Sequence, residues 1–382
     1  MHLELSLNPT LAGLPVYQPG RPIEEVAREL GLEPDGVIKL ASNENPLGPS
    51  RLAAAAMRKA VARSHLYPDG NAFYLRQKLA AKLEVSPANL VLGNGSNEIL
   101  ELLGHVLLAP GASVVVSQYC FAVYPIVTHL FGARLITVPA RNYGHDLDAL
   151  LAAITPDTRV VFIANPNNPT GTIVEPSALA RFVASVPPRV LVALDEAYIE
   201  FLRDAPDFLP EIRGGARPNL LLMRTFSKIY GLAGLRIGYG IGHPDFIAAL
   251  EKVRQPFNLN AIAQAGALAA LDDTSHVERT RRCTLRGLRL YARVFRELGL
   301  EFIPSAANFV LVRVGDGKRV FGEMQKRGVI VRPMDSYQLP EWLRITIGTP
   351  KENERCVEVL RAALQPPVAG TDAVPNPGPV AN

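Results

Sequence analysis

The sequence alternates short apolar runs with segments of helical periodicity, and this alternation restricts the possible folds more than any other feature. The apolar runs that predict strands are Leu90–Gly93, Ser113–Ser117, Leu135–Val138, Val160–Ala164, Val190–Leu194, Leu220–Met223 and Ile237–Ile241. Segments that predict helices between them include Asn97–Leu108, Ala122–Leu130, Asp146–Ala153 and Pro176–Val186. The alternation predicts an α/β fold around a mainly parallel seven-stranded sheet with helices on both faces. The link between the last two strands is too short for a crossover, so we expect that pair to be antiparallel.

The last part of the chain predicts a smaller α+β domain. A long helical span, Asn260–Gly299, contains a break near Asp272 and Asp273. After it come predicted strands and helices, namely strands Phe309–Val314, Val329–Arg332 and Leu343–Ile347 and helices Lys318–Arg327 and Thr349–Leu364. We therefore divide the chain into an N-terminal arm (1–45), a large domain (46–272), a small domain (273–365) and a proline-rich, disordered tail (366–382).

Polar motifs follow three of the predicted strands. The turn Asn165–Gly171 follows the first of these strands, and Asp195, with Tyr198 three residues later, follows the second. The third is followed by Thr225-Phe-Ser-Lys228, with Arg236 eight residues beyond the lysine. Ligands of open α/β sheets bind at the carboxyl ends of the strands, so we expect these motifs to meet in one site.

These residue types are the ones that a pocket for pyridoxal phosphate (PLP) requires. Lys228 supplies the amine for a Schiff base with the aldehyde, and hydroxyls with a guanidinium neutralise the phosphate. Asp195 would hold a proton on the pyridine nitrogen, while Asn168 and Tyr198 reach the phenolate oxygen. The hydroxyls and the guanidinium are those of Thr225, Ser227 and Arg236.

Simpler interpretations of the same residues remain open. Lys228 would then lie in an ordinary turn with Arg236 solvated, and Asp195 would be a helix N-cap or a metal ligand. Magnesium requires several converging carboxylates, and only Glu196 is adjacent, so we expect no metal. The string Gly93–Glu98 joins a strand to a helix, where Ser96 is a suitable N-cap and free backbone amides bind anions.

The order of Asn168, Asp195, Tyr198, Lys228 and Arg236 resembles that of the fold-type-I, class-II PLP-dependent aminotransferases. Further strings are similar to those of the histidinol-phosphate aminotransferases within that family, namely Ala41–Pro46, Tyr67–Gly70, Ala307–Val310 and Leu343–Gly348. The similarity extends from about Tyr17 to Leu364. It implies a large PLP-binding domain, with the N-terminal arm packed on the small domain.

The resemblance also implies roles for residues that the motifs alone do not assign. Ser96 and Asn97 would contact the PLP phosphate, and Phe121 would stack on the pyridine ring. Tyr67 would cross the interface of a homodimer to the partner's cofactor phosphate, so that the two active sites are shared. The substrate phosphate would be held by the side chains of Tyr17, Tyr67, Arg332 and Arg344, with Asn43 as a lesser candidate.

The implied activity is transamination between L-histidinol phosphate and 2-oxoglutarate, giving imidazole acetol phosphate and L-glutamate in histidine biosynthesis. An aromatic amino-acid aminotransferase or a phosphothreonine decarboxylase would use the same scaffold. A catalytically silent PLP-binding module is a weaker alternative because the set of catalytic residues is complete. A nicotinamide dehydrogenase fits worse, since no Gly-x-Gly-x-x-Gly string opens a strand-turn-helix unit near the start.

Composition excludes several other classes of function. The net charge is only +4, from 40 basic and 36 acidic residues, and there is no basic run typical of nucleic-acid binding. No apolar run is long enough to cross a membrane, and the N-terminus lacks the features of a signal peptide. Three scattered cysteines predict neither disulfides nor a zinc site, so we expect a cytoplasmic protein.

Overall fold

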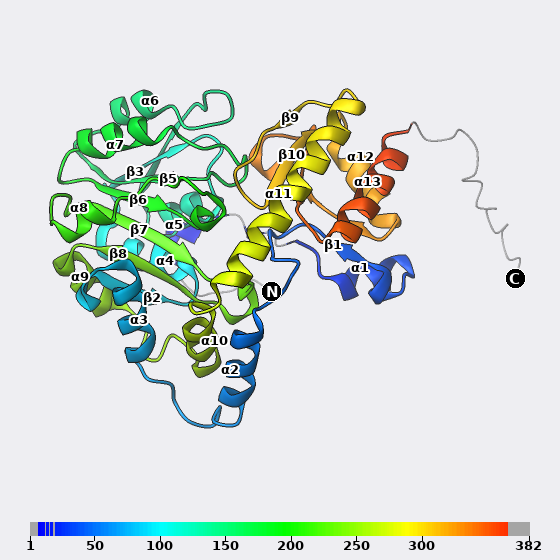
Figure 1. Ribbon diagram of the computed structural model, residues 1–382. Coiled ribbons are helices and arrows are strands. Elements are labelled where there is room, and N and C mark those ends of the chain that lie inside the picture. Colours follow the sequence, from blue (N-terminus) through cyan, green and yellow to red (C-terminus); the bar gives the residue numbers. More distant parts are fainter. Residues whose placement is uncertain (1–6, 12, 15, 18–19, 366–382) are drawn as a thin grey trace, which may run out of the picture.

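The computed structural model describes residues 7–11, 13–14, 16–17 and 20–365. Figure 1 shows a large α/β body and a smaller α+β body, with helix α11 (Thr274–Glu297) running between them. The predicted break in the long helical span is present, because α10 (Ala261–Ala270) ends before Asp272. Asp273 then caps α11 by accepting a hydrogen bond from the His276 backbone N–H. The domain boundaries placed at this break remain a prediction.

A seven-stranded sheet of order β2-β8-β7-β6-β5-β3-β4 forms the centre of the large body. Its strands are β2 (Leu90–Gly93), β3 (Ser113–Ser117), β4 (Arg134–Val138), β5 (Thr158–Ala164), β6 (Leu191–Asp195), β7 (Leu220–Thr225) and β8 (Gly238–Gly242). Strand β8 is antiparallel to both of its neighbours, and the other pairs are parallel. The mainly parallel sheet and the antiparallel pair predicted from the sequence are both confirmed.

Helices cover both faces of this sheet because its strands are apolar on both sides. Along β6, Leu191 and Ala193 pack into one core cluster, whereas Val192 and Leu194 pack into the other. One face carries α4 (Ser96–Leu107), α5 (Val123–Leu130) and α9 (Pro244–Val253). The other carries α3 (Phe73–Leu83), α6 (Leu147–Ala152), α7 (Pro176–Ser185), α8 (Leu209–Arg213) and α10, with α2 (Arg51–Val61) packed along α10.

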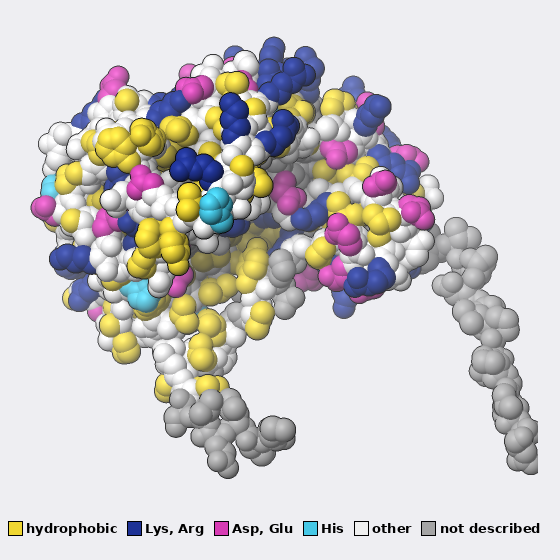
Figure 2. Space-filling model, turned by 90° about the horizontal axis from the view of Figure 1, so that it is seen from below, with side chains coloured by type: hydrophobic (Ala, Val, Ile, Leu, Met, Phe, Trp, Pro, Cys, Tyr) yellow, Lys and Arg dark blue, Asp and Glu magenta, His cyan; other side chains and the backbone are white. Residues whose placement is uncertain are grey.

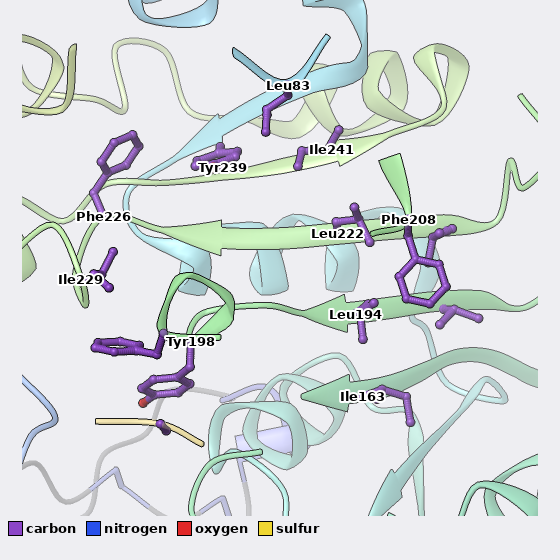
Figure 3. Close-up of a cluster of buried hydrophobic side chains, with 14 of the residues drawn as sticks. Leu83, Ile163, Leu194, Tyr198, Phe208, Leu222, Phe226, Ile229, Tyr239 and Ile241 are labelled. Atoms are coloured by element: carbon purple, nitrogen blue, oxygen red, sulfur yellow. The ribbon is translucent and has the colours of Figure 1, made fainter. Parts of the chain in front are cut away.

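The core on the second face reaches the end of the sheet where the polar motifs lie. Figure 3 shows side chains from neighbouring strands, such as Leu194 and Leu222, packed in one layer. Tyr198, just beyond the end of β6, belongs to the same cluster and is also buried. The core thus fixes the residues that follow the strands.

The smaller body contains a four-stranded sheet of order β12-β13-β10-β9. Its elements are β9 (Phe302–Ile303), β10 (Phe309–Arg313), β12 (Arg332–Pro333) and β13 (Trp342–Thr346), with α12 (Gly317–Lys326) and α13 (Pro350–Leu364). Alternate residues of β10 and β13, including Val310 and Leu343, pack against Tyr291 of α11 and Leu360 of α13.

The N-terminal segment pairs with the smaller body. After α1 (Ile23–Leu30), strand β1 (Ile38–Lys39) forms a parallel pair with β11 (Val329–Ile330). The single strand predicted at Val329–Arg332 is therefore wrong. Its first half pairs with β1, whereas Arg332 pairs with β13, so the segment changes partner at Val331.

A disordered tail and the absence of a membrane-spanning segment were also predicted from the sequence. The proline-rich segment predicted to be disordered, 366–382, lies outside the described residues, as do the first six residues. Among the helices of the described part of the chain, none has the length and apolar character needed to cross a membrane.

Candidate active site

A cavity of about 370 Å³ lies between the carboxyl ends of β5, β6 and β7 and strands β12 and β13. The motifs that the sequence analysis placed at different strand ends meet here, because the strands are neighbours in the sheet. The predicted site residues that line the cavity are Tyr17, Asn43, Ser96, Asn97, Phe121, Asn168, Asp195, Tyr198, Thr225, Ser227, Lys228, Arg236, Arg332 and Arg344. Tyr67 is the predicted site residue that does not line it.

Asp195 is the last residue of β6 and is only 6% exposed. Its Oδ2 accepts a hydrogen bond from the Tyr124 hydroxyl at 2.7 Å, and its Oδ1 accepts one from the Ala197 backbone N–H at 3.0 Å. Burial raises the pKa of Asp195, while these two donors act in the opposite direction. A carboxylate held in this way still has lone pairs for a donor that enters from the cavity.

Lys228 lies in the turn that follows β7. Its Nζ donates to the Ser42 carbonyl oxygen at 3.3 Å and lies 5.7 Å from the centre of the Tyr198 ring. Burial lowers the pKa of Lys228 to about 8, and the nearby Arg344 contributes in the same direction. A substantial fraction of the amine is therefore uncharged, and so nucleophilic, near neutral pH.

The start of α4 provides the anion-binding part of the cavity. Ser96 and Asn97 are the first two residues of this helix, where backbone N–H groups have no acceptor within the helix. The expectation that Ser96 is the N-cap is wrong, because Gly95 occupies that position with a φ of 77°. Glycine adopts this positive φ without strain, so the chain can turn sharply into the helix at this point.

Arg236 lies against the start of α4. Its Nη1 donates to Ser227 Oγ at 3.3 Å. A Cβ atom placed on Gly95 would lie 2.6 Å from Arg236 Nη2, so a side chain at this position would displace the guanidinium. The hydroxyl of Thr225 also closes the turn, since it accepts from the Ser227 backbone N–H at 3.1 Å and donates to the Ile237 carbonyl at 3.3 Å.

Two side chains expected beside the cofactor ring are oriented by neighbours from other parts of the chain. The Tyr198 hydroxyl accepts a hydrogen bond from Asn43 Nδ2 at 2.9 Å. The Oδ1 atom of Asn168 accepts from Arg344 Nη1 at 2.6 Å, which leaves the NH2 group of Asn168 on the opposite side of its amide. Asn43 and Arg344 thus connect the expected ring contacts to the substrate side of the cavity.

Arg332 and Arg344 are directly opposite each other on β12 and β13, and both line the cavity. Arg344 is 7% exposed, and its Nη2 donates to the Ala41 carbonyl at 3.0 Å. Its Nε is buried and has no hydrogen-bond partner among the described residues. The guanidinium of Arg332 lies 6.0 Å from the centre of the Tyr17 ring. Two adjacent cations in one cavity favour a dianionic ligand group.

Several residues that shape this cavity were not predicted from the sequence. Ser42, Glu44 and Tyr337 also line it, and Tyr124 hydrogen-bonds to Asp195 from behind its wall. The Tyr124 ring contacts that of Phe121 edge to face, with centroids 5.6 Å apart. A buried tyrosine needs a partner for its hydroxyl, but the sequence does not reveal which partner it has.

Tyr67 lies on the surface of the large body and is 84% exposed. Its ring stacks on that of Phe257, with centroids 4.8 Å apart. The chain therefore does not bring Tyr67 into its own cavity. A role for Tyr67 at the cofactor requires a second copy of the chain and stays a prediction.

The cavity was expected to hold no metal ion. No group of three or more His, Cys, Asp or Glu side chains that could hold a metal ion occurs among the described residues. The cysteines Cys120, Cys283 and Cys356 are all free thiols.

Comparison with known proteins identifies the family of this chain. The family model for aminotransferases of class I and II matches residues 35–360. The chain belongs to this aminotransferase family. Its recognition from the order of the site residues is therefore confirmed.

Individual relatives are similar over nearly the whole chain. A histidinol-phosphate aminotransferase from Akkermansia muciniphila is 53% identical over 95% of this chain and 100% of its own length. Histidinol-phosphate aminotransferase 2 from Ralstonia nicotianae is 53% identical over 91% of this chain and 94% of its own. The crystal structure of the Sinorhizobium meliloti histidinol-phosphate aminotransferase in complex with PLP is 30% identical and has a TM-score of 0.85. It covers 94% of this chain and 97% of that one.

The cavity of this aminotransferase has the features that PLP requires. One end offers a lysine with a lowered pKa and a buried carboxylate. Another offers helix-terminal amides beside Arg236, whose guanidinium lies close to Gly95. The lysine amine therefore matches the aldehyde of PLP, and the buried carboxylate matches its ring nitrogen. The helix-terminal amides and Arg236 match its phosphate.

Proposed function

We propose that the protein transfers the amino group of L-histidinol phosphate to 2-oxoglutarate, giving imidazole acetol phosphate and L-glutamate in histidine biosynthesis. The protein is a PLP-dependent aminotransferase, and the names of its relatives support the choice of substrate. The observation that carries this choice is the pairing of Arg332 with Arg344 across β12 and β13 in the cavity that holds Lys228. Two guanidiniums suit a phosphate monoester better than a single carboxylate.

The residues that would hold the cofactor divide according to its parts. The start of α4, with Ser227 and Arg236, would bind the phosphate, and Tyr67 of a second subunit would add to it. Asp195 would meet the ring nitrogen, Asn168 and Tyr198 the phenolate oxygen, and Phe121 one face of the ring. Bound PLP supplies an electron sink for the electrons left on the substrate carbon when a proton departs.

Lys228 is the proposed acid and base of the reaction. Its Nζ lies in the cavity with a pKa of about 8, so it can take a proton from the amine-bearing carbon of the substrate and deliver a proton again. With PLP bound, Asp195 would hold a proton at the ring nitrogen, and Tyr198 would donate to the phenolate oxygen. Arg332, Arg344 and Tyr17 orient the substrate through its phosphate, with Asn43 supporting Tyr198.

The assembly and location that we propose follow from the same features. A homodimer would bring Tyr67 of one subunit to the cavity of the other, which fits its exposure and its absence from its own cavity. Three free cysteines support a reducing compartment, so we place the protein in the cytoplasm.

The test of this function is a comparison of kcat/KM for L-histidinol phosphate and L-phenylalanine, with 2-oxoglutarate as acceptor. We expect a preference for histidinol phosphate of roughly two orders of magnitude or more, as for a site that hydrogen-bonds a polar substrate group. Arg344→Lys should remove most of this preference, because an ammonium cannot replace the bidentate fork. Arg313→Lys, an exposed arginine on the neighbouring strand, is the matched control.

Lys228→Ala should abolish turnover of both substrates. Equal kcat/KM values for the two substrates in the wild type would contradict the proposal. The cavity would then recognise a ring and a carboxylate, and the protein would be an aromatic amino-acid aminotransferase.

A further inference from the structure

The Tyr124 hydroxyl donates a hydrogen bond to Oδ2 of Asp195, a residue that lines the proposed cofactor site. We propose that Tyr124 is a positioning residue, which fixes Asp195 as an oriented carboxylate acceptor for the ring nitrogen of PLP. This inference rests on the proposed function, because it takes Asp195 as the partner of that nitrogen. It adds a residue that does not itself line the cavity.

Packing fixes the position of the Tyr124 hydroxyl independently of any ligand. The side chain is fully buried on α5, and its ring stacks on that of Phe162 with centroids 4.5 Å apart and an interplanar angle of 8°. Phe121 contacts it edge to face, and Thr128 Oγ1 donates to its backbone carbonyl at 2.8 Å. A phenol held on several sides presents its O–H to Asp195 at a constant position.

The direction of the hydrogen bond follows from the environment of both groups. Burial, and then the charge of Asp195, raise the pKa of Tyr124 well above its ordinary value, so the phenol keeps its proton and donates. The other titratable groups that influence the pair are Lys228 after β7, Tyr198 and Glu196 after β6, and Cys120 before α5. Within the described chain, the carboxylate accepts hydrogen bonds from Tyr124 and from the Ala197 N–H.

The two donors occupy different oxygens of Asp195, so together they hold the plane of the carboxylate. Loss of the phenol would leave Oδ2 buried without this donor, and the pKa of Asp195 would rise further. A protonated Asp195 can no longer accept the ring-nitrogen proton of PLP. Tyr124→Phe removes the hydroxyl alone and keeps the ring that packs on Phe162 and Phe121.

The test measures the Kd of the apoprotein for PLP and for 1-deaza-PLP, in which carbon replaces the ring nitrogen. The wild type should prefer PLP, and Asp195→Asn should remove that preference. Tyr124→Phe should reduce the preference by roughly tenfold or more, as expected for a lost hydrogen bond to a charged group. The loss should grow as the pH is lowered, because protonation of Asp195 begins at a higher pH in the variant.

The matched control is Tyr291→Phe. This residue is also a fully buried tyrosine, and its hydroxyl donates to Asn353 Oδ1 at 3.2 Å in the smaller body, away from the cavity. The Tyr291→Phe variant should leave the preference for PLP over 1-deaza-PLP unchanged. Its melting temperature shows how much stability is lost when a buried hydroxyl is removed.

Two results would overturn the proposal, and they differ in what else they affect. If Tyr124→Phe weakens PLP and 1-deaza-PLP by the same factor, or neither, Tyr124 serves packing only, and the proposed function stands. If Asp195→Asn leaves the preference intact, Asp195 does not serve the ring nitrogen, and its part in the proposed function fails together with that of Tyr124.

Discussion

Burial within the cavity controls the chemistry of Lys228. Its pKa is lowered to about 8, so protonation competes with its attack on an aldehyde near neutral pH. We predict that the rate at which the apoprotein captures PLP increases with pH and levels off above about 8. Stopped-flow absorbance of the bound cofactor measures this rate, and Lys228→Ala is the control for non-covalent binding. A midpoint near the value of about 10.4 for an exposed lysine would contradict the proposed environment.

Single residues were predicted where the chemistry requires a residue type at a strand end. Lys228, Asp195 and Asn168 follow neighbouring strands, so sequence position alone indicated a common site. Contacts between distant segments could not be predicted in this way. Tyr124 and Asp195 are 71 residues apart, and Arg344 and Asn168 are 176 residues apart. Their pairing depends on how α5 and β13 pack, which no local pattern encodes.

Among the elements, the junction of β2 and α4 restricts the residue type most specifically, because it favours glycine at position 95. Gly95→Ala would place a Cβ 2.6 Å from Arg236 Nη2 and force the guanidinium away from the start of α4. We predict that this variant loses roughly tenfold or more in PLP affinity, because a charge-assisted contact to the phosphate is lost. Fluorescence titration of the apoprotein with PLP measures the effect.

Gly111→Ala is the matched control for this variant. Gly111 also has a positive φ, of 92°, but a Cβ there meets nothing within 4 Å. Both variants bear the strain of alanine in a left-handed conformation, so they should lose similar stability. Equal loss of PLP affinity in the two variants would mean that strain, rather than the displacement of Arg236, is responsible.

The elements themselves were largely predictable because buried strands have a strong sequence pattern. The seven strands of the large sheet occur where the apolar runs predicted them. The predicted strand was wrong where the segment changes its pairing partner, at Val331. The predicted N-cap was wrong because backbone conformation, and not residue type alone, determines the start of the helix at Gly95. Hydrophobic periodicity contains no information on either property.

On the scale of the whole molecule, an exposed aromatic surface is the feature that the sequence could not predict. Large apolar side chains with high exposure lie on and around α2 and α3, among them Leu52, Val61, Leu66, Tyr67, Phe73, Tyr74 and Phe257. Figure 2 views the molecule from this side and shows hydrophobic side chains gathered on its surface. An apolar surface of this kind is typical of an interface with another protein. Because Tyr67 belongs to it, we expect a second copy of the chain to cover it.

This arrangement predicts that two inactive variants can restore activity together. In a mixed dimer of Lys228→Ala and Tyr67→Ala, one cavity would have Lys228 from one chain and Tyr67 from the other, and so be intact. The second cavity would lack both residues. Random pairing of equal amounts makes half of the dimers mixed, so activity should recover to about a quarter of the wild-type value.

The measurement is transaminase activity after the two variants are unfolded together and refolded, or co-expressed with different affinity tags. Lys228→Ala mixed with Arg344→Ala is the control. Both of these residues line the same cavity of one chain, so each cavity of a mixed dimer lacks one of them and no activity should return. If the mixture of Lys228→Ala with Tyr67→Ala is equally inactive, Tyr67 does not serve the partner's cavity.

Results

Sequence analysis

The sequence alternates short apolar runs with segments of helical periodicity, and this alternation restricts the possible folds more than any other feature. The apolar runs that predict strands are Leu90–Gly93, Ser113–Ser117, Leu135–Val138, Val160–Ala164, Val190–Leu194, Leu220–Met223 and Ile237–Ile241. Segments that predict helices between them include Asn97–Leu108, Ala122–Leu130, Asp146–Ala153 and Pro176–Val186. The alternation predicts an α/β fold around a mainly parallel seven-stranded sheet with helices on both faces. The link between the last two strands is too short for a crossover, so we expect that pair to be antiparallel.

The last part of the chain predicts a smaller α+β domain. A long helical span, Asn260–Gly299, contains a break near Asp272 and Asp273. After it come predicted strands and helices, namely strands Phe309–Val314, Val329–Arg332 and Leu343–Ile347 and helices Lys318–Arg327 and Thr349–Leu364. We therefore divide the chain into an N-terminal arm (1–45), a large domain (46–272), a small domain (273–365) and a proline-rich, disordered tail (366–382).

Polar motifs follow three of the predicted strands. The turn Asn165–Gly171 follows the first of these strands, and Asp195, with Tyr198 three residues later, follows the second. The third is followed by Thr225-Phe-Ser-Lys228, with Arg236 eight residues beyond the lysine. Ligands of open α/β sheets bind at the carboxyl ends of the strands, so we expect these motifs to meet in one site.

These residue types are the ones that a pocket for pyridoxal phosphate (PLP) requires. Lys228 supplies the amine for a Schiff base with the aldehyde, and hydroxyls with a guanidinium neutralise the phosphate. Asp195 would hold a proton on the pyridine nitrogen, while Asn168 and Tyr198 reach the phenolate oxygen. The hydroxyls and the guanidinium are those of Thr225, Ser227 and Arg236.

Simpler interpretations of the same residues remain open. Lys228 would then lie in an ordinary turn with Arg236 solvated, and Asp195 would be a helix N-cap or a metal ligand. Magnesium requires several converging carboxylates, and only Glu196 is adjacent, so we expect no metal. The string Gly93–Glu98 joins a strand to a helix, where Ser96 is a suitable N-cap and free backbone amides bind anions.

The order of Asn168, Asp195, Tyr198, Lys228 and Arg236 resembles that of the fold-type-I, class-II PLP-dependent aminotransferases. Further strings are similar to those of the histidinol-phosphate aminotransferases within that family, namely Ala41–Pro46, Tyr67–Gly70, Ala307–Val310 and Leu343–Gly348. The similarity extends from about Tyr17 to Leu364. It implies a large PLP-binding domain, with the N-terminal arm packed on the small domain.

The resemblance also implies roles for residues that the motifs alone do not assign. Ser96 and Asn97 would contact the PLP phosphate, and Phe121 would stack on the pyridine ring. Tyr67 would cross the interface of a homodimer to the partner's cofactor phosphate, so that the two active sites are shared. The substrate phosphate would be held by the side chains of Tyr17, Tyr67, Arg332 and Arg344, with Asn43 as a lesser candidate.

The implied activity is transamination between L-histidinol phosphate and 2-oxoglutarate, giving imidazole acetol phosphate and L-glutamate in histidine biosynthesis. An aromatic amino-acid aminotransferase or a phosphothreonine decarboxylase would use the same scaffold. A catalytically silent PLP-binding module is a weaker alternative because the set of catalytic residues is complete. A nicotinamide dehydrogenase fits worse, since no Gly-x-Gly-x-x-Gly string opens a strand-turn-helix unit near the start.

Composition argues against several other classes of function. The net charge is only +4, from 40 basic and 36 acidic residues, and there is no basic run typical of nucleic-acid binding. No apolar run is long enough to cross a membrane, and the N-terminus lacks the features of a signal peptide. Three scattered cysteines predict neither disulfides nor a zinc site, so we expect a cytoplasmic protein.

Overall fold

The computed structural model describes residues 7–11, 13–14, 16–17 and 20–365. Figure 1 shows a large α/β body and a smaller α+β body, with helix α11 (Thr274–Glu297) running between them. The predicted break in the long helical span is present, because α10 (Ala261–Ala270) ends before Asp272. Asp273 then caps α11 by accepting a hydrogen bond from the His276 backbone N–H. The domain boundaries placed at this break remain a prediction.

A seven-stranded sheet of order β2-β8-β7-β6-β5-β3-β4 forms the centre of the large body. Its strands are β2 (Leu90–Gly93), β3 (Ser113–Ser117), β4 (Arg134–Val138), β5 (Thr158–Ala164), β6 (Leu191–Asp195), β7 (Leu220–Thr225) and β8 (Gly238–Gly242). Strand β8 is antiparallel to both of its neighbours, and the other pairs are parallel. The mainly parallel sheet and the antiparallel pair predicted from the sequence are both confirmed.

Helices cover both faces of this sheet because its strands are apolar on both sides. Along β6, Leu191 and Ala193 pack into one core cluster, whereas Val192 and Leu194 pack into the other. One face carries α4 (Ser96–Leu107), α5 (Val123–Leu130) and α9 (Pro244–Val253). The other carries α3 (Phe73–Leu83), α6 (Leu147–Ala152), α7 (Pro176–Ser185), α8 (Leu209–Arg213) and α10, with α2 (Arg51–Val61) packed along α10.

The core on the second face reaches the end of the sheet where the polar motifs lie. Figure 3 shows side chains from neighbouring strands, such as Leu194 and Leu222, packed in one cluster. Tyr198, just beyond the end of β6, belongs to the same cluster and is also buried. The core thus helps to fix the residues that follow the strands.

The smaller body contains a four-stranded sheet of order β12-β13-β10-β9. Its elements are β9 (Phe302–Ile303), β10 (Phe309–Arg313), β12 (Arg332–Pro333) and β13 (Trp342–Thr346), with α12 (Gly317–Lys326) and α13 (Pro350–Leu364). Residues of β10 and β13, including Val310 and Leu343, pack in one cluster with Tyr291 of α11 and Leu360 of α13.

The N-terminal segment pairs with the smaller body. After α1 (Ile23–Leu30), strand β1 (Ile38–Lys39) forms a parallel pair with β11 (Val329–Ile330). The single strand predicted at Val329–Arg332 is therefore wrong. Its first half pairs with β1, whereas Arg332 pairs with β13, so the segment changes partner at Val331.

A disordered tail and the absence of a membrane-spanning segment were also predicted from the sequence. The proline-rich segment predicted to be disordered, 366–382, lies outside the described residues, as do the first six residues. Among the helices of the described part of the chain, none has the length and apolar character needed to cross a membrane.

Candidate active site

A cavity of about 370 Å³ lies between the carboxyl ends of β5, β6 and β7 and strands β12 and β13. The motifs that the sequence analysis placed at different strand ends meet here, because the strands are neighbours in the sheet. The predicted site residues that line the cavity are Tyr17, Asn43, Ser96, Asn97, Phe121, Asn168, Asp195, Tyr198, Thr225, Ser227, Lys228, Arg236, Arg332 and Arg344. Tyr67, also a predicted site residue, does not line it.

Asp195 is the last residue of β6 and is only 6% exposed. Its Oδ2 accepts a hydrogen bond from the Tyr124 hydroxyl at 2.7 Å, and its Oδ1 accepts one from the Ala197 backbone N–H at 3.0 Å. Burial raises the pKa of Asp195, while these two donors act in the opposite direction. A carboxylate held in this way still has lone pairs for a donor that enters from the cavity.

Lys228 lies in the turn that follows β7. Its Nζ donates to the Ser42 carbonyl oxygen at 3.3 Å and lies 5.7 Å from the centre of the Tyr198 ring. Burial lowers the pKa of Lys228 to about 8, and the nearby Arg344 contributes in the same direction. A fraction of the amine is therefore uncharged, and so nucleophilic, near neutral pH.

The start of α4 provides the anion-binding part of the cavity. Ser96 and Asn97 are the first two residues of this helix, where backbone N–H groups have no acceptor within the helix. The expectation that Ser96 is the N-cap is wrong, because Gly95 occupies that position with a φ of 77°. Glycine adopts this positive φ without strain, so the chain can turn sharply into the helix at this point.

Arg236 lies against the start of α4. Its Nη1 donates to Ser227 Oγ at 3.3 Å. A Cβ atom placed on Gly95 would lie 2.6 Å from Arg236 Nη2, so a side chain at this position would displace the guanidinium. The hydroxyl of Thr225 also closes the turn, since it accepts from the Ser227 backbone N–H at 3.1 Å and donates to the Ile237 carbonyl at 3.3 Å.

Two side chains expected beside the cofactor ring are oriented by neighbours from other parts of the chain. The Tyr198 hydroxyl accepts a hydrogen bond from Asn43 Nδ2 at 2.9 Å. The Oδ1 atom of Asn168 accepts from Arg344 Nη1 at 2.6 Å, which leaves the NH2 group of Asn168 on the opposite side of its amide. Asn43 and Arg344 thus connect the expected ring contacts to the expected substrate side of the cavity.

Arg332 and Arg344 are directly opposite each other on β12 and β13, and both line the cavity. Arg344 is 7% exposed, and its Nη2 donates to the Ala41 carbonyl at 3.0 Å. Its Nε is buried and has no hydrogen-bond partner among the described residues. The guanidinium of Arg332 lies 6.0 Å from the centre of the Tyr17 ring. Two adjacent cations in one cavity favour a dianionic ligand group.

Several residues that shape this cavity were not predicted from the sequence. Ser42, Glu44 and Tyr337 also line it, and Tyr124 hydrogen-bonds to Asp195 from behind its wall. The Tyr124 ring contacts that of Phe121 edge to face, with centroids 5.6 Å apart. A buried tyrosine needs a partner for its hydroxyl, but the sequence does not reveal which partner it has.

Tyr67 lies on the surface of the large body and is 84% exposed. Its ring stacks on that of Phe257, with centroids 4.8 Å apart. The chain therefore does not bring Tyr67 into its own cavity. A role for Tyr67 at the cofactor requires a second copy of the chain and stays a prediction.

The cavity was expected to hold no metal ion. No group of three or more His, Cys, Asp or Glu side chains that could hold a metal ion occurs among the described residues. The cysteines Cys120, Cys283 and Cys356 are all free thiols.

Comparison with known proteins identifies the family of this chain. The family model for aminotransferases of class I and II matches residues 35–360. The chain belongs to this aminotransferase family. The family expected from the order of the site residues is therefore confirmed.

Individual relatives of this aminotransferase are similar over nearly the whole chain. A histidinol-phosphate aminotransferase from Akkermansia muciniphila is 53% identical over 95% of this chain and 100% of its own length. Histidinol-phosphate aminotransferase 2 from Ralstonia nicotianae is 53% identical over 91% of this chain and 94% of its own. The crystal structure of the Sinorhizobium meliloti histidinol-phosphate aminotransferase in complex with PLP is 30% identical and has a TM-score of 0.85. The match covers 94% of this chain and 97% of that one.

The cavity of this aminotransferase has the features that PLP requires. One part offers a lysine with a lowered pKa and a buried carboxylate. Another offers helix-terminal amides beside Arg236, whose guanidinium lies close to Gly95. The lysine amine therefore matches the aldehyde of PLP, and the buried carboxylate matches its ring nitrogen. The helix-terminal amides and Arg236 match its phosphate.

Proposed function

We propose that the protein transfers the amino group of L-histidinol phosphate to 2-oxoglutarate, giving imidazole acetol phosphate and L-glutamate in histidine biosynthesis. The protein is a PLP-dependent aminotransferase, and the names of its relatives support the choice of substrate. The observation that carries this choice is the pairing of Arg332 with Arg344 across β12 and β13, in the cavity that holds Lys228. Two guanidiniums suit a phosphate monoester better than a single carboxylate.

The residues that would hold the cofactor divide according to its parts. The start of α4, with Ser227 and Arg236, would bind the phosphate, and Tyr67 of a second subunit would add to it. Asp195 would meet the ring nitrogen. The remaining ring contacts would come from Asn168 and Tyr198 at the phenolate oxygen and Phe121 at one face. Bound PLP supplies an electron sink for the electrons left on the substrate carbon when a proton departs.

Lys228 is the proposed acid and base of the reaction. Its Nζ lies in the cavity with a pKa of about 8, so it can take a proton from the amine-bearing carbon of the substrate and deliver a proton again. With PLP bound, Asp195 would hold a proton at the ring nitrogen, and Tyr198 would donate to the phenolate oxygen. Arg332 and Arg344 orient the substrate through its phosphate.

The assembly and location that we propose follow from the same features. A homodimer would bring Tyr67 of one subunit to the cavity of the other, which fits its exposure and its absence from its own cavity. Three free cysteines support a reducing compartment, so we place the protein in the cytoplasm.

The test of this function is a comparison of kcat/KM for L-histidinol phosphate and L-phenylalanine, with 2-oxoglutarate as acceptor. We expect a preference for histidinol phosphate of roughly two orders of magnitude or more, as for a site that hydrogen-bonds a polar substrate group. Arg344→Lys should remove most of this preference, because an ammonium cannot replace the bidentate fork. Arg313→Lys, which changes an exposed arginine on the neighbouring strand, is the matched control.

Lys228→Ala should abolish turnover of both substrates. Equal kcat/KM values for the two substrates in the wild type would contradict the proposal. The cavity would then recognise a ring and a carboxylate, and the protein would be an aromatic amino-acid aminotransferase.

A further inference from the structure

The Tyr124 hydroxyl donates a hydrogen bond to Oδ2 of Asp195, a residue that lines the proposed cofactor site. We propose that Tyr124 is a positioning residue, which fixes Asp195 as an oriented carboxylate acceptor for the ring nitrogen of PLP. This inference rests on the proposed function, because it takes Asp195 as the partner of that nitrogen. It adds a residue that does not itself line the cavity.

Packing fixes the position of the Tyr124 hydroxyl independently of any ligand. The side chain is fully buried on α5, and its ring stacks on that of Phe162 with centroids 4.5 Å apart and an interplanar angle of 8°. Phe121 contacts it edge to face, and Thr128 Oγ1 donates to its backbone carbonyl at 2.8 Å. A phenol held on several sides presents its O–H to Asp195 at a constant position.

The direction of the hydrogen bond follows from the environment of both groups. Burial, and then the charge of Asp195, raise the pKa of Tyr124 well above its ordinary value, so the phenol keeps its proton and donates. The other titratable groups that influence the pair are Lys228 after β7, Tyr198 and Glu196 after β6, and Cys120 before α5. Within the described chain, the carboxylate accepts hydrogen bonds from Tyr124 and from the Ala197 N–H.

The two donors occupy different oxygens of Asp195, so together they hold the plane of the carboxylate. Loss of the phenol would leave Oδ2 buried without this donor, and the pKa of Asp195 would rise further. A protonated Asp195 can no longer accept the ring-nitrogen proton of PLP. Tyr124→Phe removes the hydroxyl alone and keeps the ring that packs on Phe162 and Phe121.

The test measures the Kd of the apoprotein for PLP and for 1-deaza-PLP, in which carbon replaces the ring nitrogen. The wild type should prefer PLP, and Asp195→Asn should remove that preference. Tyr124→Phe should reduce the preference by roughly tenfold or more, as expected for a lost hydrogen bond to a charged group. The loss should grow as the pH is lowered, because protonation of Asp195 begins at a higher pH in the variant.

The matched control is Tyr291→Phe. This residue is also a fully buried tyrosine, and its hydroxyl donates to Asn353 Oδ1 at 3.2 Å in the smaller body, away from the cavity. The Tyr291→Phe variant should leave the preference for PLP over 1-deaza-PLP unchanged. Its melting temperature shows how much stability is lost when a buried hydroxyl is removed.

Two results would overturn the proposal, and they differ in what else they affect. If Tyr124→Phe weakens PLP and 1-deaza-PLP by the same factor, or weakens neither, Tyr124 serves packing only, and the proposed function stands. If Asp195→Asn leaves the preference intact, Asp195 does not serve the ring nitrogen, and its part in the proposed function fails together with that of Tyr124.

Discussion

Burial within the cavity controls the chemistry of Lys228. Its pKa is lowered to about 8, so protonation competes with its attack on an aldehyde near neutral pH. We predict that the rate at which the apoprotein captures PLP increases with pH and levels off above about 8. Stopped-flow absorbance of the bound cofactor measures this rate, and Lys228→Ala is the control for non-covalent binding. A midpoint near the value of about 10.4 for an exposed lysine would contradict the proposed environment.

Single residues were predictable where the chemistry requires a residue type at a strand end. Lys228, Asp195 and Asn168 follow neighbouring strands, so sequence position alone indicated a common site. Contacts between distant segments could not be predicted in this way. Tyr124 and Asp195 are 71 residues apart, and Arg344 and Asn168 are 176 residues apart. Their pairing depends on how α5 and β13 pack, which no local pattern encodes.

Among the elements, the junction of β2 and α4 restricts the residue type most specifically, because it favours glycine at position 95. Gly95→Ala would place a Cβ 2.6 Å from Arg236 Nη2 and force the guanidinium away from the start of α4. We predict that this variant loses roughly tenfold or more in PLP affinity, because a charge-assisted contact to the phosphate is lost. Fluorescence titration of the apoprotein with PLP measures the effect.

Gly111→Ala is the matched control for this variant. Gly111 also has a positive φ, of 92°, but a Cβ there meets nothing within 4 Å. Both variants bear the strain of alanine at a positive φ, so both should lose stability, but only Gly95→Ala displaces Arg236. Equal loss of PLP affinity in the two variants would mean that strain, rather than this displacement, is responsible.

The elements themselves were largely predictable because buried strands have a strong sequence pattern. The seven strands of the large sheet occur where the apolar runs predicted them. The predicted strand was wrong where the segment changes its pairing partner, at Val331. The predicted N-cap was wrong because backbone conformation, and not residue type alone, determines the start of the helix at Gly95. Hydrophobic periodicity contains no information on either property.

On the scale of the whole molecule, an exposed apolar surface is a feature that the sequence could not predict. Large apolar side chains with high exposure lie on and around α2 and α3, among them Leu52, Val61, Leu66, Tyr67, Phe73, Tyr74 and Phe257. Figure 2 views the molecule from this side and shows hydrophobic side chains on its surface. An apolar surface of this kind is typical of an interface with another protein. Because Tyr67 belongs to it, we expect a second copy of the chain to cover it.

This arrangement predicts that two defective variants can restore activity together. In a mixed dimer of Lys228→Ala and Tyr67→Ala, one cavity would have Lys228 from one chain and Tyr67 from the other, and so be intact. The second cavity would lack both residues. Random pairing of equal amounts makes half of the dimers mixed, so activity should recover to about a quarter of the wild-type value.

The measurement is transaminase activity of the mixed dimers, isolated through two different affinity tags. These isolated dimers should have about half of the wild-type activity, because one of their two cavities is intact. Lys228→Ala paired with Arg344→Ala is the control. Both of these residues line the same cavity of one chain, so each cavity of that dimer lacks one of them and no activity should return. If the dimer of Lys228→Ala with Tyr67→Ala is equally inactive, Tyr67 does not serve the partner's cavity. The reason is that a residue acting within its own chain would leave both cavities of this dimer defective, as in the control.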